Sequence, residues 1–145
     1  MFERILLAIT ETQDAAQATE TVAGLAQAFS AEVTVYHARE RVVAAGGMEE
    51  YESIPQAYEY AESVASSLAG SGVQANPVFE SVRPDELAGR VLAQADAISA
   101  DLIVLGSHHA QGLREVVFGD IGRALAHRAR CPVLVMPSAS STAGG

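Results

Sequence analysis

The sequence predicts an α/β fold, a single doubly wound domain in which a parallel sheet is covered by helices on both faces. Continuous apolar runs of strand length alternate along the chain with amphipathic stretches of helix length, which is the pattern of such a sheet. The chain has 145 residues, of which 49% are hydrophobic, so it is long enough for one domain with its own core. The pattern predicts five strands and four helices.

The first half of the chain contains two predicted strands and two predicted helices. The strands are residues 4–10 (RILLAIT) and 32–38 (EVTVYHA), which are rich in apolar and β-branched residues. Apolar residues recur at helical spacing within 14–29, which predicts the first helix. The second helix is marked by Ala57, Ala61, Val64 and Leu68. Residues 39–55 contain two glycines and an acidic cluster, and we expect a mobile crossover loop there.

The second half begins with a third predicted strand, residues 73–80 (VQANPVFE). Pro77 has no backbone N–H to donate to a neighbouring strand, so we expect this strand at an edge of the sheet. Pro84 suits the first turn of a third helix, which continues to Ile98. The apolar run 101–106 (DLIVLG) predicts a fourth, buried strand.

The last predicted helix runs from Ile121 to about Arg130, and residues 132–137 (PVLVMP) form the fifth predicted strand. Residues 138–145 (SASSTAGG) have almost nothing apolar to bury, and we expect them to be disordered. The folded domain is therefore expected to span residues 1–137.

The composition excludes several classes of function. All nine basic residues are arginine, so the lysine of a P-loop and the lysine of a Schiff-base enzyme are both missing. A net charge of −9 argues against nucleic acid as a partner, because neutralising phosphate supplies much of that affinity. Cys131 is the single cysteine, which favours a reducing compartment. With no signal-peptide pattern and no membrane-length apolar run, we expect a cytoplasmic protein without membrane contact.

Two stretches and the order of elements between them resemble the universal stress protein family. The stretches are RILLAIT, at residues 4–10, and ADLIVLGSHHAQGLREVVFGDIGRALAHRARCPVLVMP, at 100–137. The resemblance implies a five-stranded parallel sheet in the order 3-2-1-4-5 and a homodimer formed through strand five. Apart from the resemblance, the doubly wound fold predicts a ligand site at the carboxyl ends of the strands, where such sheets bind ligands.

Many members of this family bind ATP through a loop with three spaced glycines followed by Ser or Thr. Gly106 and Gly119 match the first and third glycines, whereas His109 replaces the second glycine and Asp120 replaces the Ser or Thr. The first strand ends in Thr10 rather than the usual aspartate. By resemblance and position, the candidate pocket comprises Ala8, Thr10, His37, Gly106, His108, His109, Gly119, Asp120 and Ile121.

The replacements act against a bound phosphate. A histidine side chain at 109 opposes the close backbone approach that glycine allows. Asp120 is expected to cap the last helix, but when ionised it cannot donate a hydrogen bond. Two like charges 4 Å apart repel by about 1 kcal/mol in water and about 4 kcal/mol at an intermediate dielectric. The helix dipole stabilises a bound anion by only about 0.3–1 kcal/mol. We therefore expect weak or absent ATP binding, unless a metal ion, Arg114 or a protonated histidine offsets the charge.

Other reactive residues have simpler interpretations. His108 and His109 lack a third ligand at a recognisable spacing, so no metal site is expected. Ser107, His108 and Asp120 are the residue types of a hydrolase triad, but the nucleophile-elbow motif is absent, so no catalytic residue is assigned. His37 either borders the pocket or ends its strand as a polar residue. His127 suits the last turn of its helix, and Cys131 is expected to be a buried small residue.

The sequence leads to one principal hypothesis and two alternatives. The principal hypothesis is a non-enzymatic stress-adaptation dimer that acts through an unknown protein partner and needs no cofactor. The first alternative is an ATP or AMP sensor, with slow hydrolysis conceivable only if nucleotide binds. The second is a binding module for a non-nucleotide small ligand. An ordered nucleotide, another ligand or a closed pocket would distinguish the three.

Overall fold

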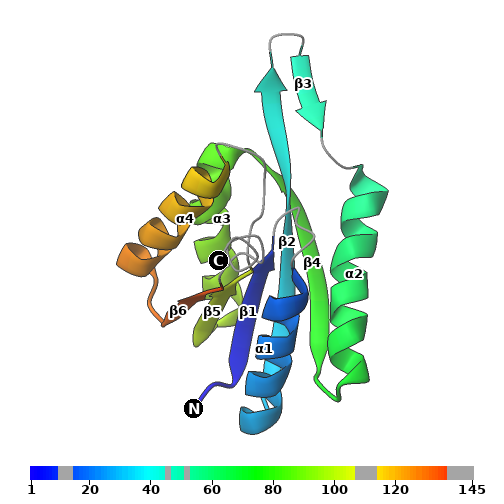
Figure 1. The fold of residues 1–145 in the computed structure, drawn as a ribbon. Coiled ribbons are helices and arrows are strands. Elements are labelled where there is room, and N and C mark those ends of the chain that lie inside the picture. The colour runs from blue at the N-terminus through cyan, green and yellow to red at the C-terminus, as the bar shows by residue number, and fades with distance from the viewer. Residues whose placement is uncertain (10–14, 45–46, 51–52, 107–113, 137–145) are drawn as a thin grey trace, which may run out of the picture.

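A computed structural model describes residues 1–9, 15–44, 47–50, 53–106 and 114–136 of the chain (Figure 1). The strands are β1 (Arg4–Ile9), β2 (Glu32–Ala44), β3 (Gly47–Glu50), β4 (Ala75–Val82), β5 (Leu102–Leu105) and β6 (Val133–Val135). The helices are α1 (Ala15–Phe29), α2 (Ile54–Gly70), α3 (Leu87–Ile98) and α4 (Arg114–Arg128). A single 3-10 turn, η1 (Pro84–Glu86), leads directly into α3, so Pro84 does open this helical segment.

Five of the strands form one parallel sheet in the order β4-β2-β1-β5-β6. Numbered as the sequence predicted them, this is the order 3-2-1-4-5, and the fold class is confirmed. Pro77 lies in β4, which is the edge strand beside β2, as its missing N–H predicted. The central strand β1 pairs with β2 on one side and with β5 on the other.

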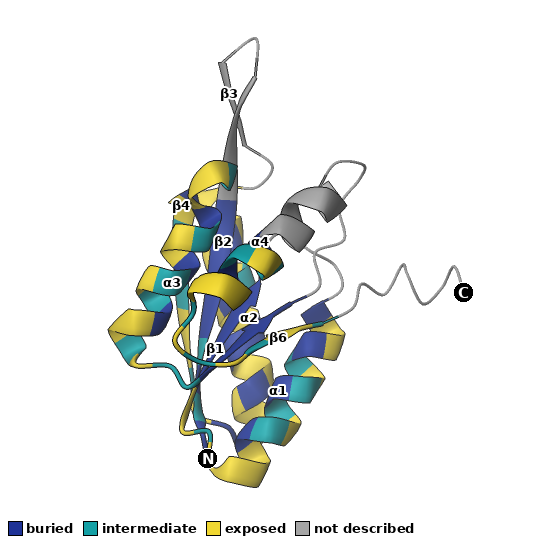
Figure 2. Cartoon of the chain, turned by 90° about the vertical axis from the view of Figure 1, so that its left-hand side faces the viewer, coloured by how far each residue is buried: buried dark blue, intermediate teal, exposed yellow. Residues whose placement is uncertain are grey.

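Helices cover both faces of the sheet, and the side chains of the strands alternate between the two. Ile5, Leu7 and Ile9 of β1 pack with α1 and α2, whereas Leu6 and Ala8 pack with α3 and α4. Figure 2 shows the central strands β1 and β2 largely buried, while the helices expose their outer surfaces. Burial on both faces explains why the central strands β1 and β5 are apolar almost without interruption.

At the amino end of the sheet, one carboxylate links β1 to β5 by hydrogen bonds. The side chain of Asp101, just before β5, accepts hydrogen bonds from the backbone N–H groups of Glu3 at 2.8 Å and Arg4 at 3.1 Å. The backbone N–H of Asp101 donates to the carbonyl of Arg4 at 2.9 Å. These bonds join residues almost one hundred positions apart in the sequence, and they fix β1 beside β5.

The crossover region differs from the predicted loop. β2 continues to Ala44, and β3 pairs with it in antiparallel register, with Arg41 opposite Glu50 and Ala44 opposite Gly47. This β2–β3 hairpin extends beyond the carboxyl ends of β1 and β5 (Figure 1). The prediction of a loop over 39–55 was therefore wrong for the described part of that range. Val42 and Val43 favour a strand, and the acidic residues of β3 do not prevent one.

The last helix also begins earlier than predicted. α4 starts at Arg114, not at Ile121, so Gly119 and Asp120 lie within the helix and Asp120 is not its N-cap. Glycine costs a helix only about 1 kcal/mol relative to alanine, which the packing of Ile121 and Leu125 can offset. The predicted disordered segment 138–145 lies outside the described residues. Among the helices of the described residues, none is long and apolar enough to cross a lipid bilayer.

Candidate functional site

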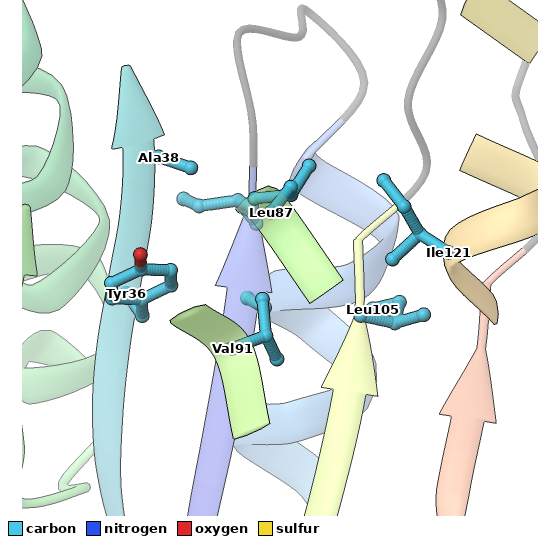
Figure 3. Close-up of a pocket in the computed structure, with 8 residues that line it drawn as sticks. Tyr36, Ala38, Leu87, Val91, Leu105 and Ile121 are labelled. Atoms are coloured by element: carbon cyan, nitrogen blue, oxygen red, sulfur yellow. The ribbon is translucent and has the colours of Figure 1, made fainter. Parts of the chain in front are cut away.

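A small cavity lies where the carboxyl ends of β1, β2 and β5 meet the helices α3 and α4. It is lined by Ala8, Ile9, Tyr36, Ala38, Leu87, Val91, Leu105 and Ile121. Figure 3 shows Leu87 and Val91 of α3 facing the strand side chains, with Ile121 of α4 at the other side. These described lining residues expose no polar atom to the cavity. The site could therefore accept the flat or apolar part of a ligand, such as a base, by shape and burial.

This cavity is narrow among the described residues. Its volume is about 10 Å³, close to the roughly 10–15 Å³ that one water molecule requires. Pockets for small ligands are usually about 300–1,000 Å³. Leu87 is only 2% exposed and Val91 only 1%, so α3 seals the cavity on that side. Among the described elements, α3 or α4 would need to move to admit a ligand the size of a purine base.

Gly106 follows β5 at the edge of this site, and it is glycine for a packing reason. A Cβ atom there would lie 2.6 Å from Cγ2 of Ile9, and a β-branched side chain cannot swing that atom away. The N–H of Gly106 donates to the carbonyl of Ala8 at 2.8 Å, which brings the two strand ends together. The first glycine of the family motif is thus required by the contact between β1 and β5, apart from any phosphate.

The opposite face of β2 carries polar side chains. His37 is completely buried, with its Nδ1 3.2 Å from the carbonyl oxygen of Ile9 and its ring packed edge-to-face against Tyr60 of α2. Two residues further on, Arg39 is 3% exposed and donates through Nη1 to the Ser81 hydroxyl at 2.8 Å. His37 therefore lies behind the strand from the cavity, and its partners give it a structural role.

A three-residue network joins β2, β4 and α3 beside the cavity. The hydroxyl of Tyr36 donates to Oε1 of Glu80 at 2.7 Å, and Arg90 donates to both carboxylate oxygens, from Nε at 3.1 Å and from Nη2 at 2.5 Å. Burial, and then the hydrogen bond to Glu80, raises the pKa of Tyr36 well above its ordinary value. The hydrogen bond from Arg90 holds the pKa of Glu80 below its usual range, although burial acts in the opposite direction. Near neutral pH, a neutral phenol therefore faces an ionised carboxylate.

The structure brings together some of the predicted site residues and not others. Ala8 and Ile121 line the cavity, and Gly106 adjoins it. Thr10, His108 and His109 lie outside the described residues, and for Gly119 and Asp120 the structure describes only the helical backbone. Sequence reasoning missed Ile9, Tyr36, Ala38, Leu87, Val91 and Leu105. Alternation along β2 was the available signal, because Tyr36 and Ala38 flank His37 and must point away from it.

Metal and thiol chemistry receive no support from the described residues. Within the part of the chain that the structure describes, no three His, Cys, Asp or Glu side chains gather to hold a metal ion. Cys131 is partly buried beside β6, and burial together with the nearby carboxylates of Asp101 and Asp96 raises the pKa of its thiol. A thiol in such surroundings is a poor nucleophile at neutral pH.

Comparison with known proteins points to a single family. A model of the universal stress protein family matches residues 1–137. A curated relative, universal stress protein YxiE of Bacillus subtilis, is 27% identical over 150 residues, covering 94% of this chain and 99% of the relative.

Solved structures share the architecture. A universal stress protein family member from Burkholderia pseudomallei has a TM-score of 0.69 at 24% identity, covering 94% of this chain and 96% of that chain. The universal stress protein from Archaeoglobus fulgidus in complex with dAMP has a TM-score of 0.63 at 23% identity, covering 92% and 96%. At these identities the likeness establishes the fold.

Proposed function

The chain belongs to the universal stress protein family, and from this membership we propose that it is a cytoplasmic stress-adaptation protein, a non-enzymatic dimer whose nucleotide pocket binds ATP weakly or not at all. Its function would then depend on contacts with a protein partner. The observation that carries this proposal is the narrow apolar cavity that the described residues form at the carboxyl ends of the strands, which is about 10 Å³ in volume.

The position of Gly119 and Asp120 within α4 supports the proposal that phosphate binds weakly or not at all. In a helix, the first four N–H groups have no partner within the helix, and these are the groups that bind anions. Because α4 begins at Arg114, the amides of Gly119 and Asp120 fall beyond that first turn. They are engaged within the helix and are not available to a phosphate. The replacement of Ser or Thr by a carboxylate at position 120 adds electrostatic repulsion to this loss of donors.

The β6 edge of the sheet supports the proposed dimer. Within the described residues β6 pairs with β5, and its side chains Leu134 and Val135 are 37% and 50% exposed. An edge strand with exposed apolar side chains favours pairing with another strand. A second copy of the same strand supplies that pairing symmetrically.

Calorimetric titration of ATP, with and without Mg²⁺, tests the pocket proposal. We expect no binding, or binding far weaker than micromolar, in the nucleotide-stripped protein. The double variant His109→Gly/Asp120→Ser should gain affinity if those residues disable the site. Micromolar binding by the wild type, about −8 kcal/mol, would overturn the proposal.

Light scattering after size exclusion tests the dimer. Val135→Glu should dissociate it, because a charge would replace an apolar side chain in the interface. Phe29→Glu is a matched control, since Phe29 is a similarly exposed apolar residue at the end of α1. A wild-type monomer would contradict the dimer.

A nucleotide sensor is the second candidate, and the dAMP complex of the Archaeoglobus fulgidus neighbour favours it. The same titration decides between the two, because a sensor must bind its nucleotide at cellular concentrations. Titration with AMP and with Mn²⁺ in place of Mg²⁺ covers the case in which a cation offsets Asp120.

A further inference from the structure

We propose that Tyr36, Glu80 and Arg90 form a catch that holds α3 over the apolar cavity and so limits the entry of a purine ring. The inference rests on the proposed function, because it takes this cavity as the ligand pocket. It assigns Glu80 and Arg90 as positioning residues, which act on the cavity through α3 and Tyr36 without lining it.

The three side chains connect the elements that surround the cavity. Tyr36 is both a wall of the cavity and a donor to Glu80, while Arg90 lies on the same helix as Leu87 and Val91. Arg90 is therefore fixed to the sheet at the level of the cavity by two hydrogen bonds to one carboxylate. To open the cavity by moving α3 outward, Arg90 must leave Glu80 or carry it away from Tyr36.

The hydrogen bonds among Tyr36, Glu80 and Arg90 are weak enough to break when α3 moves. Arg90 and Glu80 are 44% and 26% exposed, so water can replace their mutual hydrogen bonds when they separate. An exposed ion pair contributes little, whereas bidentate geometry and a buried phenol donor add to it. The network thus favours the closed position of α3 without making it permanent.

The network also determines what the cavity can recognise. The hydroxyl is the single polar group among the eight described lining side chains, and its proton is donated to Glu80. No lining side chain among these residues then has a free hydrogen-bond donor for a ligand. The cavity recognises an uncharged, flat group by shape, which suits a purine base and disfavours a charged or strongly hydrated group.

Hydrogen exchange and adenosine titration test the catch together. We compare wild type, Arg90→Gln and Tyr36→Phe, with Arg83→Gln as the matched control. Arg83 is an exposed arginine beside α3, and the ion pairs described for it join it to Asp85 and Glu86 of η1. Adenosine is the probe because it has no phosphate, so its binding is independent of the charge at Asp120.

The catch predicts a pattern that a merely structural role does not. Backbone amides of 87–98 should exchange about threefold or more faster in Arg90→Gln and Tyr36→Phe than in wild type, while those of β1 remain unchanged. Adenosine affinity should rise by a similar factor although stability falls, and Arg90→Lys should restore part of the protection. Arg83→Gln should match wild type in both measurements.

Two results would overturn the proposal. Equal exchange of α3 in wild type and Arg90→Gln would mean that the network does not hold the helix. Faster exchange without tighter adenosine binding would mean that the helix does not limit entry. Failure of the proposed function is a separate result, because it appears as micromolar ATP binding by the wild-type protein.

Discussion

At the carboxyl end of the sheet, the face under α1 and α2 carries two buried polar side chains, whereas the face under α3 and α4 encloses a narrow apolar cavity. His37 and Arg39 occupy the first face, where each is buried and hydrogen-bonded. Tyr36 and Ala38, their neighbours on the same strand, line the cavity on the second. The hydrogen bonds of His37 and Arg39 go to other groups of the protein, whereas an apolar cavity can enlarge without leaving polar groups unsatisfied. His37 and Arg39 therefore stabilise the fold on the α1–α2 face, and the candidate binding cavity lies on the α3–α4 face.

The largest expected effect comes from shortening a core leucine on each face. Leu7→Ala on the first face and Leu105→Ala in the cavity wall should each lower the free energy of unfolding by about 2–5 kcal/mol. Both leucines are at most 1% exposed, so the two losses should be similar. Adenosine should recover part of the loss in Leu105→Ala alone, because that deletion enlarges the cavity. Urea unfolding with and without adenosine measures this, and an equal response in both variants would remove the distinction between the faces.

Gly106→Ala should destabilise the protein by about 1–3 kcal/mol through overpacking, because the new methyl group meets Ile9. Gly89→Ala in α3 is the control, since a Cβ there meets nothing within 4 Å. That substitution should stabilise the helix by up to about 1 kcal/mol. Thermal unfolding of both variants measures the two effects. Equal melting temperatures for Gly106→Ala and wild type would contradict tight packing of Gly106 against Ile9.

His37→Phe should cost about 1 kcal/mol, because the ring still packs against Tyr60 but loses its hydrogen bond with the Ile9 carbonyl. Adenosine affinity should stay unchanged, since His37 lies behind the strand from the cavity. Denaturant unfolding and titration on the same sample check both points. A change in affinity larger than the change in stability would place His37 in the binding site after all.

The smallest effect should appear as a dependence of stability on pH. The pKa of Glu80 is lowered in the folded state, mainly by Arg90, so its ionised form stabilises the fold above the unfolded pKa. That contribution is lost as the pH falls through the lowered, folded pKa. Wild type should therefore be more stable than Glu80→Gln near pH 7, and the two should converge in acid. Urea unfolding from pH 7 downward measures the difference, and a constant difference would contradict the assignment.

The sequence predicted the parallel sheet because central strands such as β1 and β5, which are buried on both faces, are apolar almost without interruption. It did not predict the hairpin, since glycines and acidic residues outweighed the valines in the interpretation of 39–55. The start of α4 was misplaced because Gly119 and Asp120 were taken to mark the beginning of the helix, which starts at Arg114. In the candidate site, Ala8 and Ile121 followed from position in the fold. Leu87 and Val91 could not, because the packing angle of α3 on the sheet is a tertiary property that no local pattern encodes.

The central position of β1 has a consequence for how the chain folds. Its second neighbour, β5, lies about one hundred residues further along, so during synthesis an apolar strand edge stays unpaired until most of the protein has emerged. Contacts of such long sequence separation slow folding. The carboxylate of Asp101 reaches back to Glu3 and Arg4 only at that late stage. Truncated chains that stop before β5 should therefore aggregate, and a ribosome-bound nascent chain should need protection by a chaperone until the last third has been made.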